Sequence, residues 1–270
     1  MSLTRRSALA LCAAGLASPA WAQPSATDPS RVSLQQGGFA LLRSSPRAAV
    51  SLDGEAVGAA SAAGWTVIGF DRDAAPSARL AVAGQAERTL TIAQRPWRTQ
   101  AVNGLPQDTV TPSDPALLAR IRREAELKAR AFASRADIDD FAGSWSAPVA
   151  GTMSSSFGSQ RILNGQPSRP HYGIDIAAAR GTPVSAPAGG VVVLAEPDLH
   201  FEGGLILVDH GQGLVSAYLH LSRIDARVGQ GVARGDRLGA VGATGRATGP
   251  HLCWRLKWRN QNMDPSLWVA

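Results

Sequence analysis

The sequence predicts a mainly β protein with an N-terminal β-module, a connecting helix and a C-terminal, Gly-rich antiparallel β domain. Short apolar runs recur between turn residues over 23–108, and one helical pattern covers 114–136. Residues 145–270 are dense in Gly and Val and lack helical periodicity. A chain of 270 residues can form two modest domains. We therefore expect modules at 23–108 and 145–270, joined by a helix and linker at 109–144.

The first 22 residues resemble an export signal. Basic Arg5-Arg6 precedes an apolar run over 7–20 that is too short to span a membrane, and Ala20-Trp21-Ala22 fits a cleavage site. We expect export to the periplasm or cell envelope, by a general secretory or a twin-arginine route. No later segment is apolar enough to span a membrane, and cleavage leaves Cys253 as the sole cysteine, which excludes an intramolecular disulfide.

The N-terminal module shows strand-length apolar runs and hairpin turns. Asp53-Gly54 is a strong hairpin signal and Ala83-Gly84 a weaker one. We find no catalytic pattern here and expect the module to position or shield the rest of the chain. The apolar runs are Phe39–Leu42, Val50–Leu52, Trp65–Phe70, Leu80–Val82 and Leu90–Ile92.

The helix expected over 114–136 has a clear beginning. Asp114 can cap it and Pro115 suits its first position. Glu124 and Lys128 are spaced to form an ion pair on its polar side. A connector packed between two domains is the preferred interpretation over a partner-binding helix. The apolar side is a partial stripe of Leu117, Leu118, Ile121, Ala125 and Phe132.

The C-terminal domain is predicted to contain strands near 189–194, 205–208, 214–219 and 251–258. In the last strand, large apolar residues alternate with polar ones. Leu252, Trp254, Leu256 and Trp258 should face the core. His251, Cys253, Arg255 and Lys257 should then face a cleft.

Two other extended segments carry chemically active groups. His171 and Asp175 should share one face of the segment around 171–176, and Tyr218 and His220 one face of another strand. Imidazole, carboxylate and thiolate groups bind zinc. His171, Asp175 and Cys253 thus make a metal site assembled from separate strands the sharpest hypothesis. His210 and His200 are interpreted as a structural and a solvated residue.

The charge balance bears on possible partners. The chain has 27 Lys and Arg against 21 Asp and Glu, and only Lys128 and Lys257 are lysines. A mild basic excess without a dense basic run suits an anionic polymer and does not call for nucleic acid. Arg255 and other cleft arginines could hold a substrate carboxylate or simply be solvated charges.

An ordered set of motifs over about 148–270 resembles the lysostaphin-type (LytM-domain) zinc metalloendopeptidases, a peptidoglycan-hydrolase family. The set begins with His171-x3-Asp175 and Gly181-Thr182-Pro183-Val184. It continues with Tyr218-Leu219-His220-Leu221 and the Gly231–Pro250 stretch, which leads into His251.

The resemblance implies a zinc ion held by His171, Asp175 and residue 253. This chain has Cys253 where the family has the second histidine of a His-x-His motif. The first histidine of that motif is His251, which with His220 would act on the attacking water or the tetrahedral intermediate. Cysteine is still a zinc ligand, but a thiolate adds negative charge and makes the metal a weaker Lewis acid.

The implied function is exported, zinc-dependent cleavage of peptide cross-links in peptidoglycan. Other cell-wall hydrolases are expected as further partners, and nucleic acid is not. The alternative is a degenerate LytM-like domain that binds peptidoglycan or activates a cell-wall amidase without catalysis. A biotinyl or lipoyl carrier, suggested by the Gly231–Gly239 pattern, is rejected because neither lysine lies on a hairpin turn.

Overall fold

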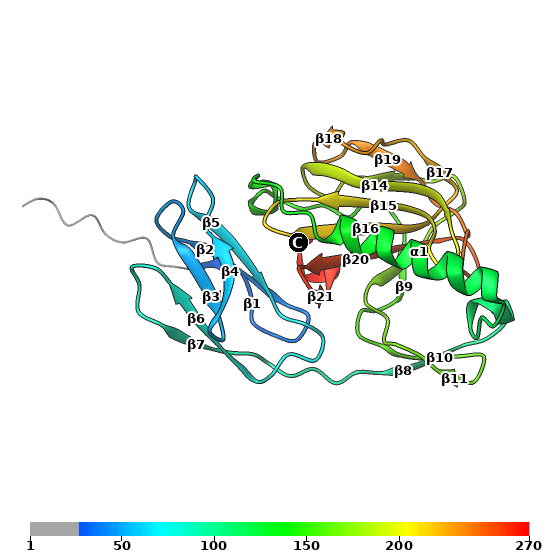
Figure 1. Ribbon diagram of the computed structural model, residues 1–270, viewed down its shortest axis with the longest axis horizontal. Coiled ribbons are helices and arrows are strands. Elements are labelled where there is room, and N and C mark those ends of the chain that lie inside the picture. The colour runs from blue at the N-terminus through cyan, green and yellow to red at the C-terminus, as the bar shows by residue number, and fades with distance from the viewer. Residues whose placement is uncertain (1–26, 270) are drawn as a thin grey trace, which may run out of the picture.

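The computed structural model describes residues 27–269, so the expected signal at 1–22 lies outside the described residues. Figure 1 shows two β modules joined by an extended segment, with one α-helix packed on the C-terminal module. The predicted mainly β class with antiparallel sheets is confirmed. Within the described part of the chain, no helix is long and apolar enough to cross a membrane.

The N-terminal module consists of two small antiparallel sheets. The Asp53-Gly54 turn has positive φ angles of 53° and 86°, as expected for a tight hairpin. The sequence did not single out β4, because its residues are mostly exposed and not strongly apolar. One sheet has the order β1 (Thr27–Ser33), β2 (Phe39–Arg43), β5 (Trp65–Gly69). The other has the order β4 (Glu55–Ala59), β3 (Ala49–Leu52), β6 (Ser77–Val82), β7 (Arg88–Thr91).

The segment between the modules contributes a strand to the second module. β8 (Thr99–Val102) pairs in parallel with β10 (Gln160–Leu163), which also pairs with β11 (Gln166–Pro167). A short 3-10 helix, η1 (Gln107–Thr109), then leads towards α1 (Pro115–Phe132). The linker therefore lies along the C-terminal module before the helix begins.

Helix α1 begins as predicted, but its ion pairs differ from the expectation. Asp114 accepts a hydrogen bond from the Leu117 backbone N–H at 2.7 Å, and Pro115 is the first helical residue. The expected pair between Glu124 and Lys128 is wrong. Glu124 pairs with Arg120 at 2.6 Å, and Lys128 pairs with Glu202 of the β14–β15 turn at 2.6 Å. Tertiary packing brings Glu202 to Lys128, and Arg120 lies one turn before Glu124 on the helix.

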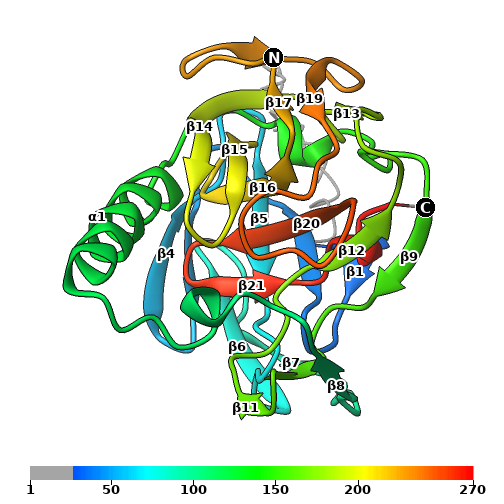
Figure 2. The same ribbon diagram turned by 90° about the vertical axis from the view of Figure 1, so that its right-hand side faces the viewer.

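The apolar stripe of α1 is less buried than its pattern suggested. Only Glu124 and Ala131 of the helix are buried, while Ile121 is half-buried and Ala125 is exposed. Figure 2 shows α1 alongside β14 at one side of the C-terminal sheet. The helix thus packs along one side of the sheet and contributes few residues to the core.

The C-terminal module is built on an eight-stranded antiparallel sheet of order β18-β14-β15-β16-β20-β12-β9, with β21 paired to β20. A second, three-stranded sheet has the order β13-β19-β17. Two short 3-10 helices, η2 (Asp140–Ala142) and η3 (Pro265–Leu267), flank the large sheet in sequence. The strands of the large sheet are β9 (Thr152–Ser155), β12 (Ile174–Ala177), β14 (Gly190–Leu199), β15 (Gly203–Asp209), β16 (Leu214–Leu221), β18 (Gly231–Val232), β20 (His251–Trp258) and β21 (Gln261–Met263). Those of the small sheet are β13 (Pro183–Ser185), β17 (Arg223–Ile224) and β19 (Arg237–Ala240).

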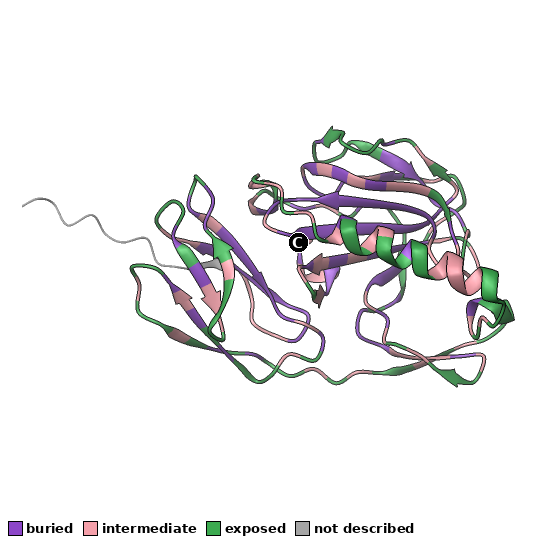
Figure 3. Cartoon of the chain, in the orientation of Figure 1, coloured by how far each residue is buried: buried purple, intermediate pink, exposed green. Residues whose placement is uncertain are grey.

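The two faces of β20 separate as its alternation predicted. The buried apolar side chains form two clusters, and the larger one is called the main core here. It contains four residues of β20, Leu252, Trp254, Leu256 and Trp258. Cys253 packs in the second cluster with Leu219. Figure 3 shows the central strands β15 and β16 as buried along their whole length, whereas β20 alternates between buried and half-buried residues towards its end. Cys253 therefore lies on the face opposite the main core.

The two modules share this main core. Phe39 of β2 stacks on Trp268 with ring centroids 4.0 Å apart, and both belong to one cluster of buried side chains. Arg95 makes an ion pair with the buried Asp264 at 2.9 Å, and Arg72 Nε donates to the Gly158 carbonyl at 2.7 Å. The junction combines apolar packing with buried polar contacts.

Candidate metal centre

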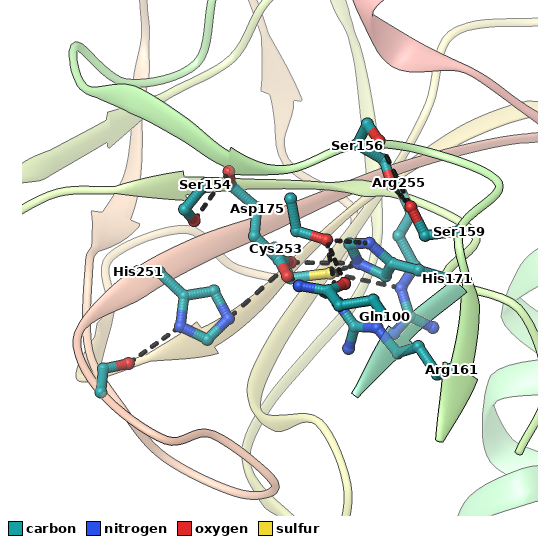
Figure 4. A network of polar contacts seen from close by, with 12 residues as sticks. Gln100, Ser154, Ser156, Ser159, Arg161, His171, Asp175, His251, Cys253 and Arg255 are labelled. Atoms are coloured by element: carbon teal, nitrogen blue, oxygen red, sulfur yellow. Dashed lines mark hydrogen bonds and ion pairs between the residues drawn. The ribbon is translucent and has the colours of Figure 1, made fainter. Parts of the chain in front are cut away.

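His171, Asp175 and Cys253 converge on one point of the C-terminal module. Their potential ligand atoms all lie within 4.8 Å of one another, and all three side chains are buried. His171 Nε2 is 3.4 Å from Cys253 Sγ and 3.1 Å from Asp175 Oδ1. Figure 4 shows these side chains pointing towards one another. The structure thus brings together the three residues expected to be ligands.

Strand pairing places two of these residues directly side by side. Asp175 of β12 and Cys253 of β20 are cross-strand partners in the antiparallel sheet. His171 lies just before β12, which begins at Ile174. Its backbone N–H donates to the Ser159 carbonyl at 2.8 Å, and its own carbonyl accepts from the Gly158 N–H at 2.8 Å. Loop hydrogen bonds therefore fix a residue that the sequence had placed on a strand face.

The protonation of His171 is set by Ser155 and Gln100. Ser155 Oγ donates to Gln100 Oε1 at 2.9 Å, which leaves its oxygen to accept from His171 Nδ1 at 3.2 Å. Burial lowers the pKa of His171, so the ring is neutral. With its proton on Nδ1, the ring directs the Nε2 lone pair at Asp175 and Cys253.

Asp175 presents a carboxylate with one free oxygen. Oδ2 accepts from Arg161 at 2.7 Å, whereas the buried Oδ1 has no hydrogen-bond partner within residues 27–269. Burial acts to raise the pKa of Asp175. At the low pH where this carboxyl would take up a proton, however, His171 is itself protonated, and its charge together with that of Arg161 holds the pKa of Asp175 well below its usual range. An ionised, buried oxygen without a donor is costly unless a cation lies beside it.

Cys253 is buried beside a guanidinium. Burial raises the pKa of its thiol to about 12, and the nearby Arg255 charge opposes this effect. Arg255 Nε donates to Cys253 Sγ at 3.5 Å. A metal ion would have to displace the thiol proton, and Arg255 would then lie against the thiolate.

His220 and His251 lie beside this group. Their ring centroids are 4.8 Å apart, and His251 Nε2 is 3.8 Å from Asp175 Oδ1. His220 Nδ1 donates to the Thr244 carbonyl and His251 Nδ1 to the Gly249 carbonyl, each at 2.8 Å. In the neutral rings both Nε2 atoms are then unprotonated. Burial is the main reason that the pKa of His220 falls to about 3.

The expectation that Tyr218 and His220 share a face is wrong. Tyr218 is fully buried in the main core, where its hydroxyl contacts Ser216 Oγ at 2.7 Å. The pairing of β15 with β16 shifts register here, and His220 has a positive φ of 65°. This irregularity interrupts the two-residue alternation and turns His220 into the cleft.

The donor set fits a zinc ion. An imidazole nitrogen, a carboxylate oxygen and a thiol sulfur are all zinc ligands, and a fourth position remains for water or substrate. The free Oδ1 of Asp175 and the Nε2 of His171 both face the sulfur. Two cavities of about 500 and 510 Å³ meet at this group and share Arg161, His220 and Arg246.

Sequence reasoning missed the supporting residues of the site. Gln100, Ser155, Arg161 and Arg246 come from the linker strand, two other strands and a loop. None belongs to a spacing pattern of metal ligands, so no local signal marked them.

Comparison with known proteins identifies the family. The sequence model of Peptidase family M23 matches residues 169–265. The structure is similar to that of a putative peptidase M23 from Pseudomonas aeruginosa, with 32% identity and a TM-score of 0.65. That similarity covers 88% of this chain and 95% of the other. The chain belongs to peptidase family M23, which confirms the resemblance to LytM-type peptidases.

Several curated relatives match the C-terminal part more narrowly. Peptidoglycan DD-endopeptidase ShyA of Vibrio cholerae is 45% identical over 95 residues, which is 35% of this chain and 22% of the relative. Cell division protein DipM of Caulobacter vibrioides is 35% identical over 131 residues, 46% of this chain and 21% of the relative. The Lipoprotein NlpD/LppB homolog of Pseudomonas aeruginosa is 40% identical over 123 residues, 46% of this chain and 39% of the relative. The matches with ShyA and DipM span about a fifth of those relatives' length.

Proposed function

We propose that this chain is an exported zinc metalloendopeptidase that cleaves peptide cross-links of peptidoglycan. The observation that carries the proposal is the buried convergence of His171, Asp175 and Cys253, with an ionised Oδ1 that lacks a donor. Similarity to a protein named as a peptidoglycan DD-endopeptidase supports the substrate class.

In this proposal His171 Nε2, Asp175 Oδ1 and Cys253 Sγ hold the ion. Zinc, when bound, supplies a Lewis acid for the scissile carbonyl and an activated water nucleophile. Arg161 keeps Asp175 ionised and oriented through Oδ2, and Ser155 fixes the ring of His171. Arg255 offsets part of the negative charge that a thiolate brings to the centre.

His220 and His251 are the proposed acid–base groups. Each ring has its Nδ1 proton held by a backbone carbonyl, so its Nε2 is left to accept a proton or, after protonation, to donate one. A protonated Nε2 can also donate to the developing oxyanion. Both residues enter the proposal together in these roles.

A non-catalytic domain is the second candidate. Cys253 in place of the family histidine is the observation that favours it, because a thiolate weakens the Lewis acidity of the ion. Such a domain would bind peptidoglycan or activate a cell-wall amidase, and other cell-wall hydrolases would be its partners.

Digestion of purified cell wall separates the two candidates. The protein without residues 1–22 is incubated with cell wall, with chelator, and with chelator followed by stoichiometric zinc, and the fragments are identified by mass. We expect new peptide termini that disappear with chelator and return with zinc. Zinc bound at one equivalent without any new termini would favour the non-catalytic domain.

A further inference from the structure

The cavity beside α1 combines the proposed metal ligands with an unusual excess of positive charge. It has a volume of about 510 Å³ and is lined by Ile121, Ala125 and Lys128 of α1. His171, Cys253 and Arg255 line it from the C-terminal module. A substrate bound at the proposed metal centre would therefore extend into this cavity.

Cations outnumber anions around the centre. Within residues 27–269, the two cavities at the centre are lined by five arginines and lysines but only two carboxylates. Both carboxylates already have partners, since Arg161 pairs with Asp175 at 2.7 Å and Lys128 pairs with Glu202 at 2.6 Å. The other cations are Arg169, Arg246 and Arg255, and none has a carboxylate within 4.0 Å in the described chain.

Arg246 is held in place by uncharged neighbours. One Nη donates to the Thr109 carbonyl at 3.1 Å, and the guanidinium carbon lies 5.0 Å from the centre of the Phe201 ring. Its backbone N–H donates to the Phe201 carbonyl at 2.9 Å. Burial, followed by the charges of Arg255 and Arg161, lowers its pKa. Arg246 is thus an oriented, half-buried guanidinium without a counter-ion.

Arg255 is the second cation of this kind. Its Nε donates to Cys253 Sγ at 3.5 Å, and its two Nη groups have no hydrogen-bond partner within the described chain. Figure 4 shows its side chain beside His171 and Cys253. The Nη groups therefore remain available to a ligand that enters the cavity.

We propose that Arg246 and Arg255 form a subsite that binds a carboxylate of the peptide substrate next to the scissile bond. The inference deepens the proposed function and rests on it. A carboxylate matches the fork geometry of guanidinium groups, and peptides supply it at a C-terminus or on a side chain. Half-buried arginines without counter-ions are not simply solvated charges, so the substrate-binding interpretation of these residues is favoured.

The two sources of the carboxylate can be distinguished with synthetic peptides. The probes are the pentapeptide Ala-D-Glu-Lys-D-Ala-D-Ala, its C-terminal amide, and its D-glutamate carboxamide. We expect kcat/KM of the zinc-loaded protein to fall by about tenfold or more for one of the two amides, because a charged hydrogen bond is lost. The amide whose kcat/KM falls identifies the carboxylate that the subsite binds.

Arg246→Gln tests the residue itself. In this variant we expect the ratio between acid and amide substrates to approach one, and Arg246→Lys to restore part of it. Arg180→Gln, an exposed arginine outside both cavities, is the matched control and should keep the wild-type ratio. Equal rates for acid and amides with the wild type, or an unchanged ratio in Arg246→Gln, would overturn the inference.

A binding measurement separates failure of this inference from failure of the proposed function. Calorimetric titration of the metal-free protein with the same peptides requires no hydrolysis. If no peptide is cleaved but the acid binds about tenfold more tightly than one amide, and Arg246→Gln removes that preference, the subsite stands and the peptidase proposal falls. If acid and amides bind equally or not at all, the subsite is refuted.

Discussion

At the residue scale, polar neighbours that are not proposed ligands themselves orient the proposed ligand side chains. Ser155 fixes the ring of His171, and Arg161 occupies one oxygen of Asp175. Such supporting contacts set both the direction and the basicity of a ligand.

Ser155→Ala tests this support. The change should remove the hydrogen bond to His171 Nδ1 and lower zinc affinity by about 10- to 100-fold without loss of fold. Affinity is measured by competition with a chromogenic chelator, and circular dichroism checks the fold. Ser146→Ala, a half-buried serine remote from the centre, is the control. Unchanged affinity in Ser155→Ala would show that His171 is not oriented in this way.

His220→Ala and His251→Ala test the acid–base proposal. Each should lower the rate of cell-wall cleavage by about 10²- to 10⁴-fold, because proton transfer at the reacting group is lost. Zinc content should remain at the wild-type level, since neither residue is a proposed ligand. His200→Ala is the control, because His200 contacts the Asp108 carbonyl away from the centre. Full activity in both cleft variants would refute the assigned roles.

Substitution of Cys253 tests how the thiol affects the ion. Cys253→His should retain the fold and raise cleavage activity. A neutral imidazole in place of the thiolate takes a negative charge away from the ligand set, so the ion becomes a stronger Lewis acid. Cys253→Ser should bind zinc poorly. The opposing factor is steric, as Cys253 is buried 3.4 Å from His171 and 3.5 Å from Arg255. Zinc content and cleavage are measured in parallel. If neither the wild type nor Cys253→His holds zinc, the non-catalytic candidate is supported.

At the scale of elements, strand register and one irregularity build the centre. Pairing of β12 with β20 aligns Asp175 with Cys253, while the register shift of β16 turns His220 away from Tyr218. A chain of buried hydrogen bonds holds the other end of β15 and β16. Tyr218 contacts Ser216, Ser216 contacts His210, and His210 Nδ1 donates to the Gly189 carbonyl at 2.5 Å.

This chain of hydrogen bonds predicts a pH-dependent stability. Burial is the main reason that the pKa of His210 falls from 6.5 to about 4, because a charged imidazolium in the protein interior loses the solvation that it has in water. A depressed histidine pKa means that stability is fully present above about pH 6.5. Stability should fall as the pH decreases towards 4, because the unfolded chain takes up the proton first, and His210 should contribute up to about 3 kcal/mol of this loss. The buried His171 and His220, whose pKa values are also lowered, add to the same fall.

Chemical denaturation of the metal-free protein between pH 4 and 7 measures this effect. His210→Gln lowers the stability at pH 7 but should flatten the dependence of unfolding free energy on pH. His200→Gln, at a half-buried histidine, should leave the wild-type slope in place. Equal slopes in wild type and His210→Gln would contradict the prediction.

At the scale of the whole molecule, the two β modules share one main core. Phe39 and Trp268 stack across the junction, and the Arg95–Asp264 pair also links the two modules, in a partly buried environment. Domains that share a core are expected to unfold together. Peptidase and N-terminal module would then form one cooperative unit.

Calorimetry of the metal-free protein tests this cooperativity. We expect a single thermal transition whose calorimetric and van't Hoff enthalpies agree. Trp268→Ala should lower the unfolding free energy by about 3–5 kcal/mol through loss of buried apolar contacts. It should also split the transition if the junction carries the coupling. Two resolved transitions in the wild type would show that the modules unfold independently.

Much of the fold and of the candidate site could be predicted from the sequence because both follow from local patterns. The alternation in β20 separated Cys253 from Trp254, and the Asp114-Pro115 pair marked the start of α1. The three proposed ligands were expected together because the ordered motifs resemble those of a known family. Strand period and capping are properties of neighbouring residues, and the order of the motifs can be read directly along the chain.

The tertiary structure alone decided which distant groups meet. It brings Lys128 into an ion pair with Glu202, and it interrupts the regular strand alternation at His220. It also placed Arg246 and Arg255 in one cavity with the centre. Contacts of this kind depend on loop paths and register shifts, whose energies are sums over many distant residues and leave no periodic signal in the chain. The sequence by itself therefore determined the fold class and the proposed ligands, and the packing of loops, helix and sheet determined the charge and the hydrogen bonds around them.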